Sequence, residues 1–291
     1  MASPIPRLGD VSRRRAGDPG KVPSTREGTR SARTFWWDRA RPVDADVRPL
    51  RAVIFDIDGA MADIERDGHR AAFNAAFAAY GLKIVWDVDT YGHLLSIPDE
   101  HQRIAADLHW RGFGKASKPL AAQLLKRKRE VFAECVLDGD VSPRQGLIDL
   151  VMSLFVVGVW VGVVTPRPRP WAEPLVRQLV GDGLVETIVT ADDLSDATGV
   201  PDLHALALWE MGIGPESALA IVGSAAGVRA AVGAGLATIA VSTDYTAGQD
   251  FTGAAEVRSS YEGADPLLAA TCERLHRRWW TARTRTARAA A

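Results

Sequence analysis

The sequence predicts an α/β protein in which a parallel sheet is flanked by helices and an all-helical domain is inserted behind the first strand. Three observations predict this fold class. A short apolar run at residues 51–56 ends in Asp and Gly, as expected of a strand buried on both faces of a parallel sheet. The block from about residue 67 to 136 is rich in Ala, Leu, Lys and Arg and poor in strand signals. After Pro143 strand-like and helix-like segments alternate, which is typical of βαβ units.

The elements follow in order along the chain. Apolar residues recur at helical spacing over residues 67–79, and Gly81 is a suitable stop. Further strands are expected at 159–164, 187–190, 218–222 and 237–241, and helices at 170–181, 201–211 and 226–234. Right-handed crossovers then bring the carboxyl ends of the strands to one edge, where ligands of such sheets bind.

Residues 150–164 form an uncharged, mostly apolar stretch with two interpretations. Fifteen residues fall short of the roughly 18–20 that cross a bilayer. Gly158 also divides the stretch into a helix end and a strand. A buried helix followed by a strand is therefore preferred to a membrane span.

The two ends of the chain are basic and the middle is acidic, although the net charge is only −1. Residues 1–48 carry eleven Lys or Arg against six Asp or Glu, and residues 273–291 carry six Arg against one Glu. Such tails bind nucleic acid or anionic membranes in some proteins, but a solvated tail is the simpler interpretation. No nucleic-acid motif accompanies them. The two cysteines, Cys135 and Cys272, lack the spacing of a disulfide framework or a zinc site.

Asp56 and Asp58 are the first candidates for chemistry. They lie two residues apart at the end of the first strand, so both can project toward one pocket. Two carboxylates there can act as nucleophile and as general acid or base, often around a divalent cation. The alternative is an ordinary strand-to-loop turn, because Asp and Gly favour turns.

The segment from Phe55 to Ala60, Phe-Asp-Ile-Asp-Gly-Ala, resembles the first motif of the haloacid dehalogenase (HAD) superfamily. Later segments are similar to its CbbY-type branch, which includes relatives of sugar-bisphosphate phosphatases and β-phosphoglucomutases. They include 65–70 (Glu-Arg-Asp-Gly-His-Arg), 72–74 (Ala-Phe-Asn) and 245–251 (Tyr-Thr-Ala-Gly-Gln-Asp-Phe). The resemblance spans about residues 50–265. It implies a Rossmann-like HAD core with an inserted helical cap.

The resemblance also implies roles for individual residues. Asp56 would be the nucleophile and Asp58 the general acid, with both able to contact Mg²⁺. Thr165 matches the second motif, whose hydroxyl holds a phosphoryl oxygen, although a simple strand-end turn remains open and Pro166 has no N–H to donate. The implied substrate contacts from the cap are Glu65, His69, Arg70 and Asn74.

The third and fourth motifs depart from the family pattern. Thr198 stands where the family has a Lys, and Val222 and Gly223 stand where it has the acidic residues that hold Mg²⁺. Arg167 or Arg169 is a possible substitute for the lysine, and Asp192 and Asp193 are the nearest acids, which otherwise serve as helix caps or turn residues. The cap has Asp99-Glu100-His101 where the branch has Gly-Gly-Lys, and two acidic side chains there would repel a phosphate.

These observations predict four regions: a disordered basic tail (1–48), the core (49–63 and 141–270), the helical cap (64–140) and a basic C-terminal tail (271–291). The expected function is a cytoplasmic phosphatase of a small phosphorylated sugar, acting through an aspartyl-phosphate at Asp56. Its activity is expected to be weak because the motif lysine and the metal carboxylates are absent. The alternative is an inactive protein of the same fold that binds a small anion or a protein partner.

Overall fold

The computed structural model describes residues 47–138, 141–194 and 202–290. The chain divides into two compact units, Met1–Pro42 and Val43–Ala291, and the fold below is that of the second. The expected disordered tail therefore lies, apart from its last two residues, outside the described part of the chain. Thr198 lies outside it as well.

The core is one six-stranded sheet in which every neighbouring pair of strands is parallel. The strand order is β3-β2-β1-β4-β5-β6. The strands are β1 (Ala52–Asp56), β2 (Trp160–Thr165), β3 (Thr187–Thr190), β4 (Ala218–Val222), β5 (Ala237–Val241) and β6 (Glu256–Arg258). The first five are the strands expected from the sequence. The sixth was not predicted, since its three residues are only partly buried and carry no apolar run.

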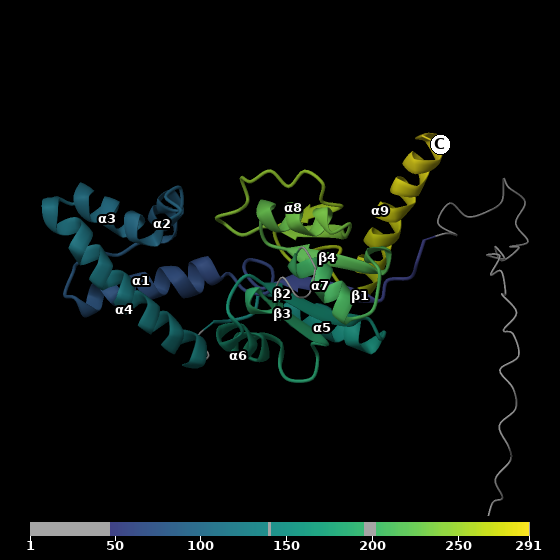
Figure 1. Ribbon diagram of the computed structural model, residues 1–291, viewed down its shortest axis with the longest axis horizontal. Coiled ribbons are helices and arrows are strands. Elements are labelled where there is room, and N and C mark those ends of the chain that lie inside the picture. Colours follow the sequence, from purple (N-terminus) through teal and green to yellow (C-terminus); the bar gives the residue numbers. More distant parts are fainter. Residues whose placement is uncertain (1–46, 139–140, 195–201, 291) are drawn as a thin grey trace, which may run out of the picture. The chain divides into compact units, whose positions relative to one another are not determined.

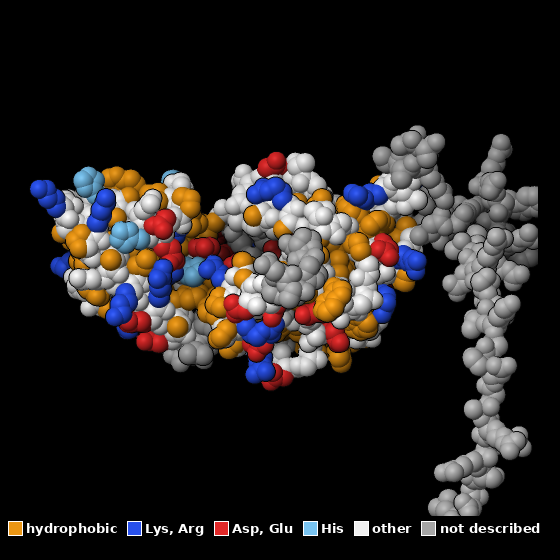
Figure 2. All heavy atoms as spheres, viewed as in Figure 1, with side chains coloured by type: hydrophobic (Ala, Val, Ile, Leu, Met, Phe, Trp, Pro, Cys, Tyr) orange, Lys and Arg blue, Asp and Glu red, His pale blue; other side chains and the backbone are white. Residues whose placement is uncertain are grey.

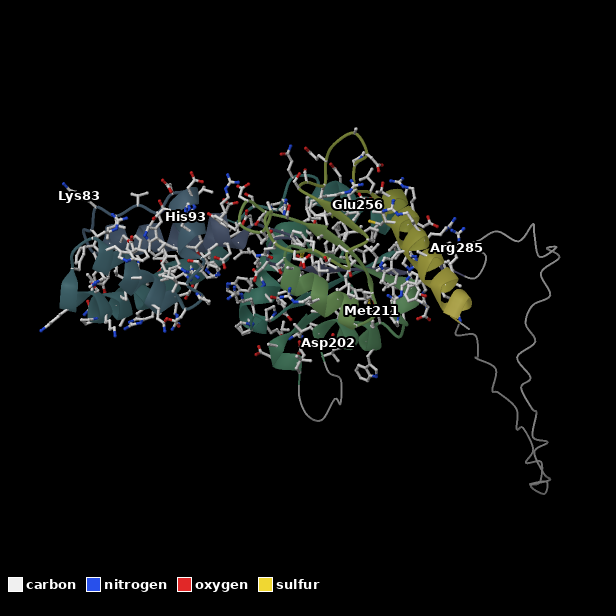
Figure 3. The ribbon with its side chains drawn as sticks, turned by 90° about the horizontal axis from the view of Figure 1, so that it is seen from above. Lys83, His93, Asp202, Met211, Glu256 and Arg285 are labelled. Carbon is white, nitrogen blue, oxygen red and sulfur yellow. The ribbon has the colours of Figure 1, made fainter. Side chains whose placement is uncertain are left out.

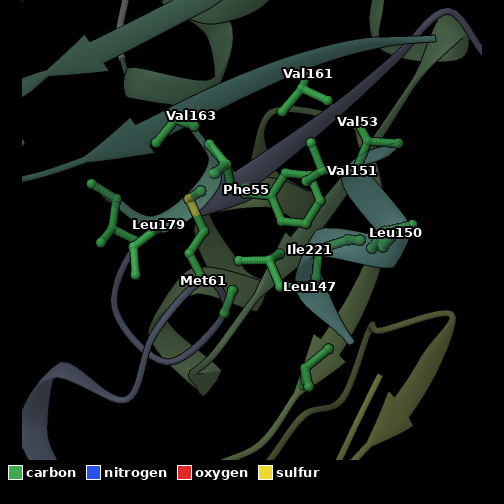
Figure 4. Close-up of a cluster of buried hydrophobic side chains, with 14 of the residues drawn as sticks. Val53, Phe55, Met61, Leu147, Leu150, Val151, Val161, Val163, Leu179 and Ile221 are labelled. Carbon is green, nitrogen blue, oxygen red and sulfur yellow. The ribbon is translucent and has the colours of Figure 1, made fainter. Parts of the chain in front are cut away.

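Alternate residues of the strands enter two separate apolar clusters, one on each face of the sheet. Val53 and Phe55 of β1 pack with residues of α5, α6 and α9, as Figure 4 shows for part of this cluster. Ala52 and Ile54 face α7 and α8 on the other side. A strand covered on both faces has no room for polar alternation, which explains its continuous apolar sequence.

Helices cover both faces, as Figure 1 shows. The core helices are α5 (Leu147–Val156), α6 (Arg169–Val180), α7 (Leu203–Glu210), α8 (Ala225–Gly233) and α9 (Ala269–Ala290). The uncharged stretch at 150–164 is the end of α5 followed by β2, so the helix-plus-strand interpretation is confirmed, although only one face of the helix is buried and Phe155 and Val156 are exposed. None of the described helices is long and apolar enough to span a membrane.

The inserted domain is entirely helical over its described residues. It begins after a π-helical turn, Ile64–His69, and contains α1 (Arg70–Ala79), α2 (Val88–Leu94), α3 (Glu100–Trp110) and α4 (Ser117–Asp138). Its own apolar cluster is built around Phe73, Phe77 and Trp86, all fully buried. The predicted class, a Rossmann-like core with an inserted helical cap, is confirmed.

The segment expected as a basic C-terminal tail belongs to helix α9. Its first turns are part of the core, because Cys272 and Leu275 are buried in the same cluster as β1. The arginines follow on the later turns, where Arg285 is exposed and is labelled near the end of the helix in Figure 3.

Candidate active site

Asp56 and Asp58 lie at the carboxyl edge of the sheet, at the end of its central strand. β1 is paired with β2 on one side and with β4 on the other, and Asp56 lies opposite Val164 of β2. The chain leaves this edge through Ile57 and turns at Gly59, whose φ of 79° suits a residue without a Cβ. The expected projection of both carboxylates toward one site follows from this geometry.

A pocket of about 400 Å³ opens at this edge. Asp56, Asp58 and Thr165 line it together with residues from the start of α7 and α8. A larger depression of about 680 Å³ runs along α9 but shares no residue with this pocket and holds no pair of carboxylates. The pocket at the sheet edge is therefore the candidate active site.

Asp56 lies against the first turn of α8. A Cβ on Gly227 would come within 2.5 Å of Asp56 Oδ2, so only glycine allows this approach. The amino end of a helix carries partial positive charge and favours a nearby anion. The burial of Asp56 has a larger effect than the helix end. Together with the neighbouring Asp58, it raises the pKa of Asp56 to about 7. Near neutral pH the Asp56 carboxyl is thus present in both its protonated and its ionised form.

Asp58 is paired with Arg167. Nε and one terminal nitrogen of the guanidinium each lie 3.3 Å from Asp58 Oδ2. The other oxygen, Oδ1, is buried and has no hydrogen-bond partner among the described residues. One oxygen of Asp58 is therefore held in place, while the other is available to a ligand or a proton.

Thr165 ends β2 and is buried at the pocket wall. Its Oγ accepts a hydrogen bond from the backbone N–H of Arg167 at 3.2 Å. This bond forms the turn expected from a strand-end Thr. The hydroxyl hydrogen is not used in it, so the same side chain can still donate to a phosphoryl oxygen.

His204 was missed by the sequence analysis. It lies in the first turn of α7, after the N-cap residue Asp202, which Figure 3 labels. Its side chain is only 4% exposed, and Nε2 lies 3.6 Å from Asp56 Oδ1 without a hydrogen-bond partner. Burial lowers the pKa of His204 to about 4, so the imidazole is neutral at pH 7. A lone histidine in a helical segment carries no signal that would have singled it out.

All four expected substrate contacts from the cap have partners within the protein, and two of them, Asn74 and Arg70, bond backbone groups. The Asn74 amide bonds both backbone groups of Trp86, donating to its O at 2.9 Å and accepting from its N at 2.8 Å. Arg70 donates to the same carbonyl at 3.3 Å and to Arg66 O at 3.2 Å. Both side chains hold the connection between α1 and α2.

The other two, Glu65 and His69, lie nearer the core. Glu65 accepts a hydrogen bond from the Tyr91 hydroxyl at 2.6 Å. His69 is buried with Nδ1 3.0 Å from Lys128 Nζ and Nε2 3.4 Å from a terminal nitrogen of Arg167. Burial, followed by these two cations, holds the pKa of His69 well below its usual value. Figure 2 shows acidic, basic and histidine side chains gathered where the helical insertion joins the core.

The acidic loop of the cap does not carry the repulsion expected of it. Glu100 forms an ion pair with Lys128, a buried lysine of α4. Asp99 is the N-cap of α3 and accepts from the backbone N–H of Gln102 at 2.7 Å. Both acids therefore have structural partners, and a phosphate would not meet two free charges there.

The residues at the fourth motif do not fit a magnesium ion. Val222 is apolar and fully buried, and a Cβ on Gly223 would lie 2.5 Å from Gly59 Cα and 2.6 Å from Asp58 O. The space in which a carboxylate would stand is closed by backbone. Within residues 47–138, 141–194 and 202–290 no group of three or more His, Cys, Asp or Glu is arranged to hold a metal. Mg²⁺ takes near-octahedral oxygen coordination, which two carboxylates with one oxygen already paired to arginine do not provide.

Asp192 and Asp193 do not supply the missing ligands. Asp193 accepts from the backbone and hydroxyl of Thr190 and pairs with Arg169 at 2.6 Å. Asp192 accepts from the backbone N–H of Arg169 at 2.8 Å. The capping interpretation of this acidic pair is therefore confirmed.

The chain is similar to several known proteins. Residues 53–241 match the family model described as haloacid dehalogenase-like hydrolase. The protein CbbY of Cereibacter sphaeroides is 34% identical over 215 residues, which cover 73% of this chain and 93% of CbbY. An N-acetylmuramic acid 6-phosphate phosphatase of Pseudomonas aeruginosa is 29% identical over 201 residues, covering 69% of this chain and 85% of the phosphatase.

A solved structure supports the same relationship. The crystal structure of a CbbY variant from Rhodobacter sphaeroides in complex with xylulose-1,5-bisphosphate superposes with a TM-score of 0.58 and 32% identity. The match covers 77% of this chain and 99% of that one.

Proposed function

Since the chain belongs to the haloacid dehalogenase-like hydrolase family, we propose that it hydrolyses the phosphate ester of a small phosphorylated sugar. The observation that carries the proposal is the meeting of Asp56, Asp58 and Thr165 at one pocket on the carboxyl edge of the sheet. The relatives named above include a sugar-phosphate phosphatase and a CbbY bound to a sugar bisphosphate, which supports this substrate class.

In the first step a carboxylate oxygen of Asp56 attacks phosphorus, and the bond from phosphorus to the leaving oxygen breaks. Asp58, which enters this step protonated at Oδ1, the oxygen without a hydrogen-bond partner among the described residues, delivers that proton to the leaving alcohol. The Thr165 hydroxyl donates to a phosphoryl oxygen. The product of this step is an aspartyl-phosphate on Asp56 and a free sugar hydroxyl.

In the second step water attacks the aspartyl-phosphate. Asp58 takes the proton from that water, which restores it as an acid, and the Asp56 carboxylate leaves with inorganic phosphate as product. His204 Nε2 lies beside Asp56 Oδ1 and is available to hold the carboxylate in position once either group carries a proton.

Purified protein should hydrolyse an aryl phosphate and a panel of sugar phosphates, and Asp56→Asn should abolish that turnover. A nucleophile and its acid together account for many orders of magnitude in rate, so the variant should fall to the level of a mock preparation. If the wild-type protein at high concentration releases no phosphate above the mock preparation, hydrolysis is not its function.

A second candidate is a protein that binds a small phosphorylated ligand without turning it over. The closed backbone contact between Gly59 and Gly223 favours it, because the usual metal carboxylates are absent. Calorimetry on the same panel separates the two candidates. Saturable binding without phosphate release supports the second, and release that Asp56→Asn abolishes supports the first.

A further inference from the structure

We propose that the guanidinium of Arg167 provides the positive charge of this site and that phosphate binds there without a divalent cation. The inference rests on the proposed function only in taking phosphate as the anion. It follows from the space that the fourth motif leaves, from the contacts of Arg167 and from the way Arg167 is held.

The first step concerns the space beside Asp58. Gly223 lies so close to Gly59 that no side chain fits between them. Val222, at the other acidic position, is buried in the apolar cluster under α7 and α8. A cation placed near Asp56 and Asp58 would find no third carboxylate among the described residues. The site must therefore obtain its positive charge from a side chain.

The second step concerns charge. An ionised Asp56 and an ionised Asp58 would each repel an incoming phosphate, and the repulsion is strong at short distance in a partly buried site. Arg167, at 3.3 Å from Asp58 Oδ2, offsets one of these charges. Its side chain is 37% exposed, so part of the guanidinium still faces solvent and can meet a ligand. Five N–H groups in a planar fork allow it to bond a carboxylate and a phosphoryl oxygen together.

The third step concerns what holds Arg167 beside the pocket. Its backbone N–H is bonded to Thr165 Oγ at 3.2 Å, which fixes the turn that follows β2. The guanidinium lies 5.7 Å from the centre of the Trp171 ring. Trp171 stacks on Phe132, which stacks on His69, the residue that faces the guanidinium from the other side. The position of Arg167 is therefore built into the fold from both the core and the linker to the cap.

The fourth step concerns the polar atoms that remain available. His204 Nε2 and Asp58 Oδ1 are buried at the pocket without hydrogen-bond partners among the described residues. An unpartnered buried polar atom destabilises the protein, and a ligand group that bonds to it removes that cost. The Thr165 hydroxyl can donate to a phosphoryl oxygen. Asp58, His204 and Thr165 line the pocket with Asp56, and Arg167 lies next to them through its contact with Asp58 Oδ2.

Arg169 provides a matched control two residues away. It pairs with Glu173 and Asp193 at 2.6 Å each and donates to Ile188 O at 2.9 Å, so its guanidinium is engaged away from Asp56 and Asp58. Removing its charge changes the local net charge as much as removing that of Arg167. Only the Arg167 variant removes a group beside the pocket.

The experiment measures binding of inorganic phosphate by calorimetry to the full chain, first with a chelator present and then with added Mg²⁺. We expect binding in the chelator and a dissociation constant that Mg²⁺ changes by less than about twofold. Arg167→Gln should weaken binding by about tenfold or more, equivalent to about 1.4 kcal/mol, whereas Arg169→Gln should leave it unchanged. Arg167→Lys keeps the charge without the fork and should give an intermediate value.

Circular dichroism and thermal unfolding of each variant exclude misfolding as the cause. Binding that appears only with Mg²⁺, or equal binding by Arg167→Gln and wild type, overturns the inference. Turnover of an aryl phosphate is measured beside it. Phosphate binding without turnover contradicts the proposed hydrolysis but leaves Arg167 as the binding residue. Turnover that depends on Mg²⁺ supports the hydrolysis but contradicts phosphate binding through Arg167 without a divalent cation.

Discussion

A Cβ added to Gly223 would lie 2.5 Å from Gly59 Cα, so the two glycine backbones are in direct contact beside Asp58. Gly223→Ala should therefore displace the loop that carries Asp58. Overpacking of this kind typically costs about 1–3 kcal/mol, which we expect as a lower free energy of unfolding in urea. Gly233→Ala is the control, because no described atom lies within 4 Å of its Cβ and it is the last residue of α8, the helix that follows Gly223. Equal stability of both variants would contradict the contact.

The ionisation of Asp56 should appear both in turnover and in stability. Its pKa of about 7 means that the ionised nucleophile accumulates as the pH rises through 7, so kcat for an aryl phosphate should rise over that range and then level off. A value of kcat that is flat or falls between about pH 6 and pH 8 would contradict the assignment.

The same group should destabilise the fold above the pH at which an unfolded aspartate ionises. Because its pKa is raised in the folded state, the cost of burying the charge grows from about pH 4 to about pH 7 and then stays constant. Asp56→Asn removes this cost. At pH 8 the variant should raise Tm by roughly 2–4 °C for each kcal/mol of this cost that it removes, and near pH 4 it should raise Tm by much less.

Asn74 should contribute chiefly to the stability of the helical cap. Its amide satisfies both backbone groups of Trp86, which is fully buried. Asn74→Ala leaves the buried Trp86 N–H without its partner and the Trp86 carbonyl with the Arg70 bond alone, at a cost of about 1–3 kcal/mol in urea unfolding. Gln123→Ala, which removes an exposed amide on α4, should change stability by less than about 0.5 kcal/mol. A change in KM for a sugar phosphate without loss of stability would instead support the substrate role expected for Asn74.

His276 should make the protein sensitive to acid. It is buried between α9 and the loop before β4, with Nε2 3.1 Å from Glu216 O, and burial lowers its pKa to about 4. The unfolded chain takes up a proton below about pH 6.5 and the folded chain does not, so stability is lost as the pH falls from about 6.5 toward 4. His276→Gln should reduce the loss between about pH 7 and pH 5, by up to about 2 kcal/mol. His93→Gln, which replaces an exposed histidine, should leave this loss of stability at low pH unchanged.

Much of the fold could be predicted because the sheet is buried on both faces. The bounds of β4 and β5 follow from apolar runs that have Gly or Ser at or next to their ends. β6 could not be found in this way, since Glu256 and Arg258 pair with each other and give it no apolar pattern. The start of α9 was missed for a similar reason: its buried residues are few and are separated by arginines that face outward.

The site could be predicted only in part. Asp56, Asp58 and Thr165 follow strands, and strand ends meet at one edge whatever the details of packing. The substitute for the motif lysine was left open between Arg167 and Arg169, because the direction of a long side chain depends on contacts that sequence order does not contain. His204 was missed because its approach to Asp56 depends on how α7 packs on β2 and β3.

The position of β1 in the sheet has a consequence for how the protein folds. Ala52 lies opposite Trp160 on one side and Ala218 on the other, so the strand that carries Asp56 finds both neighbours only far along the chain. Closing such long loops is slow, and sheets whose strands pair across long sequence separations fold slowly. The strand that leaves the ribosome first is thus among the last to be fixed. A chain that stops before residue 218 would leave Asp56 on a strand without its second neighbour.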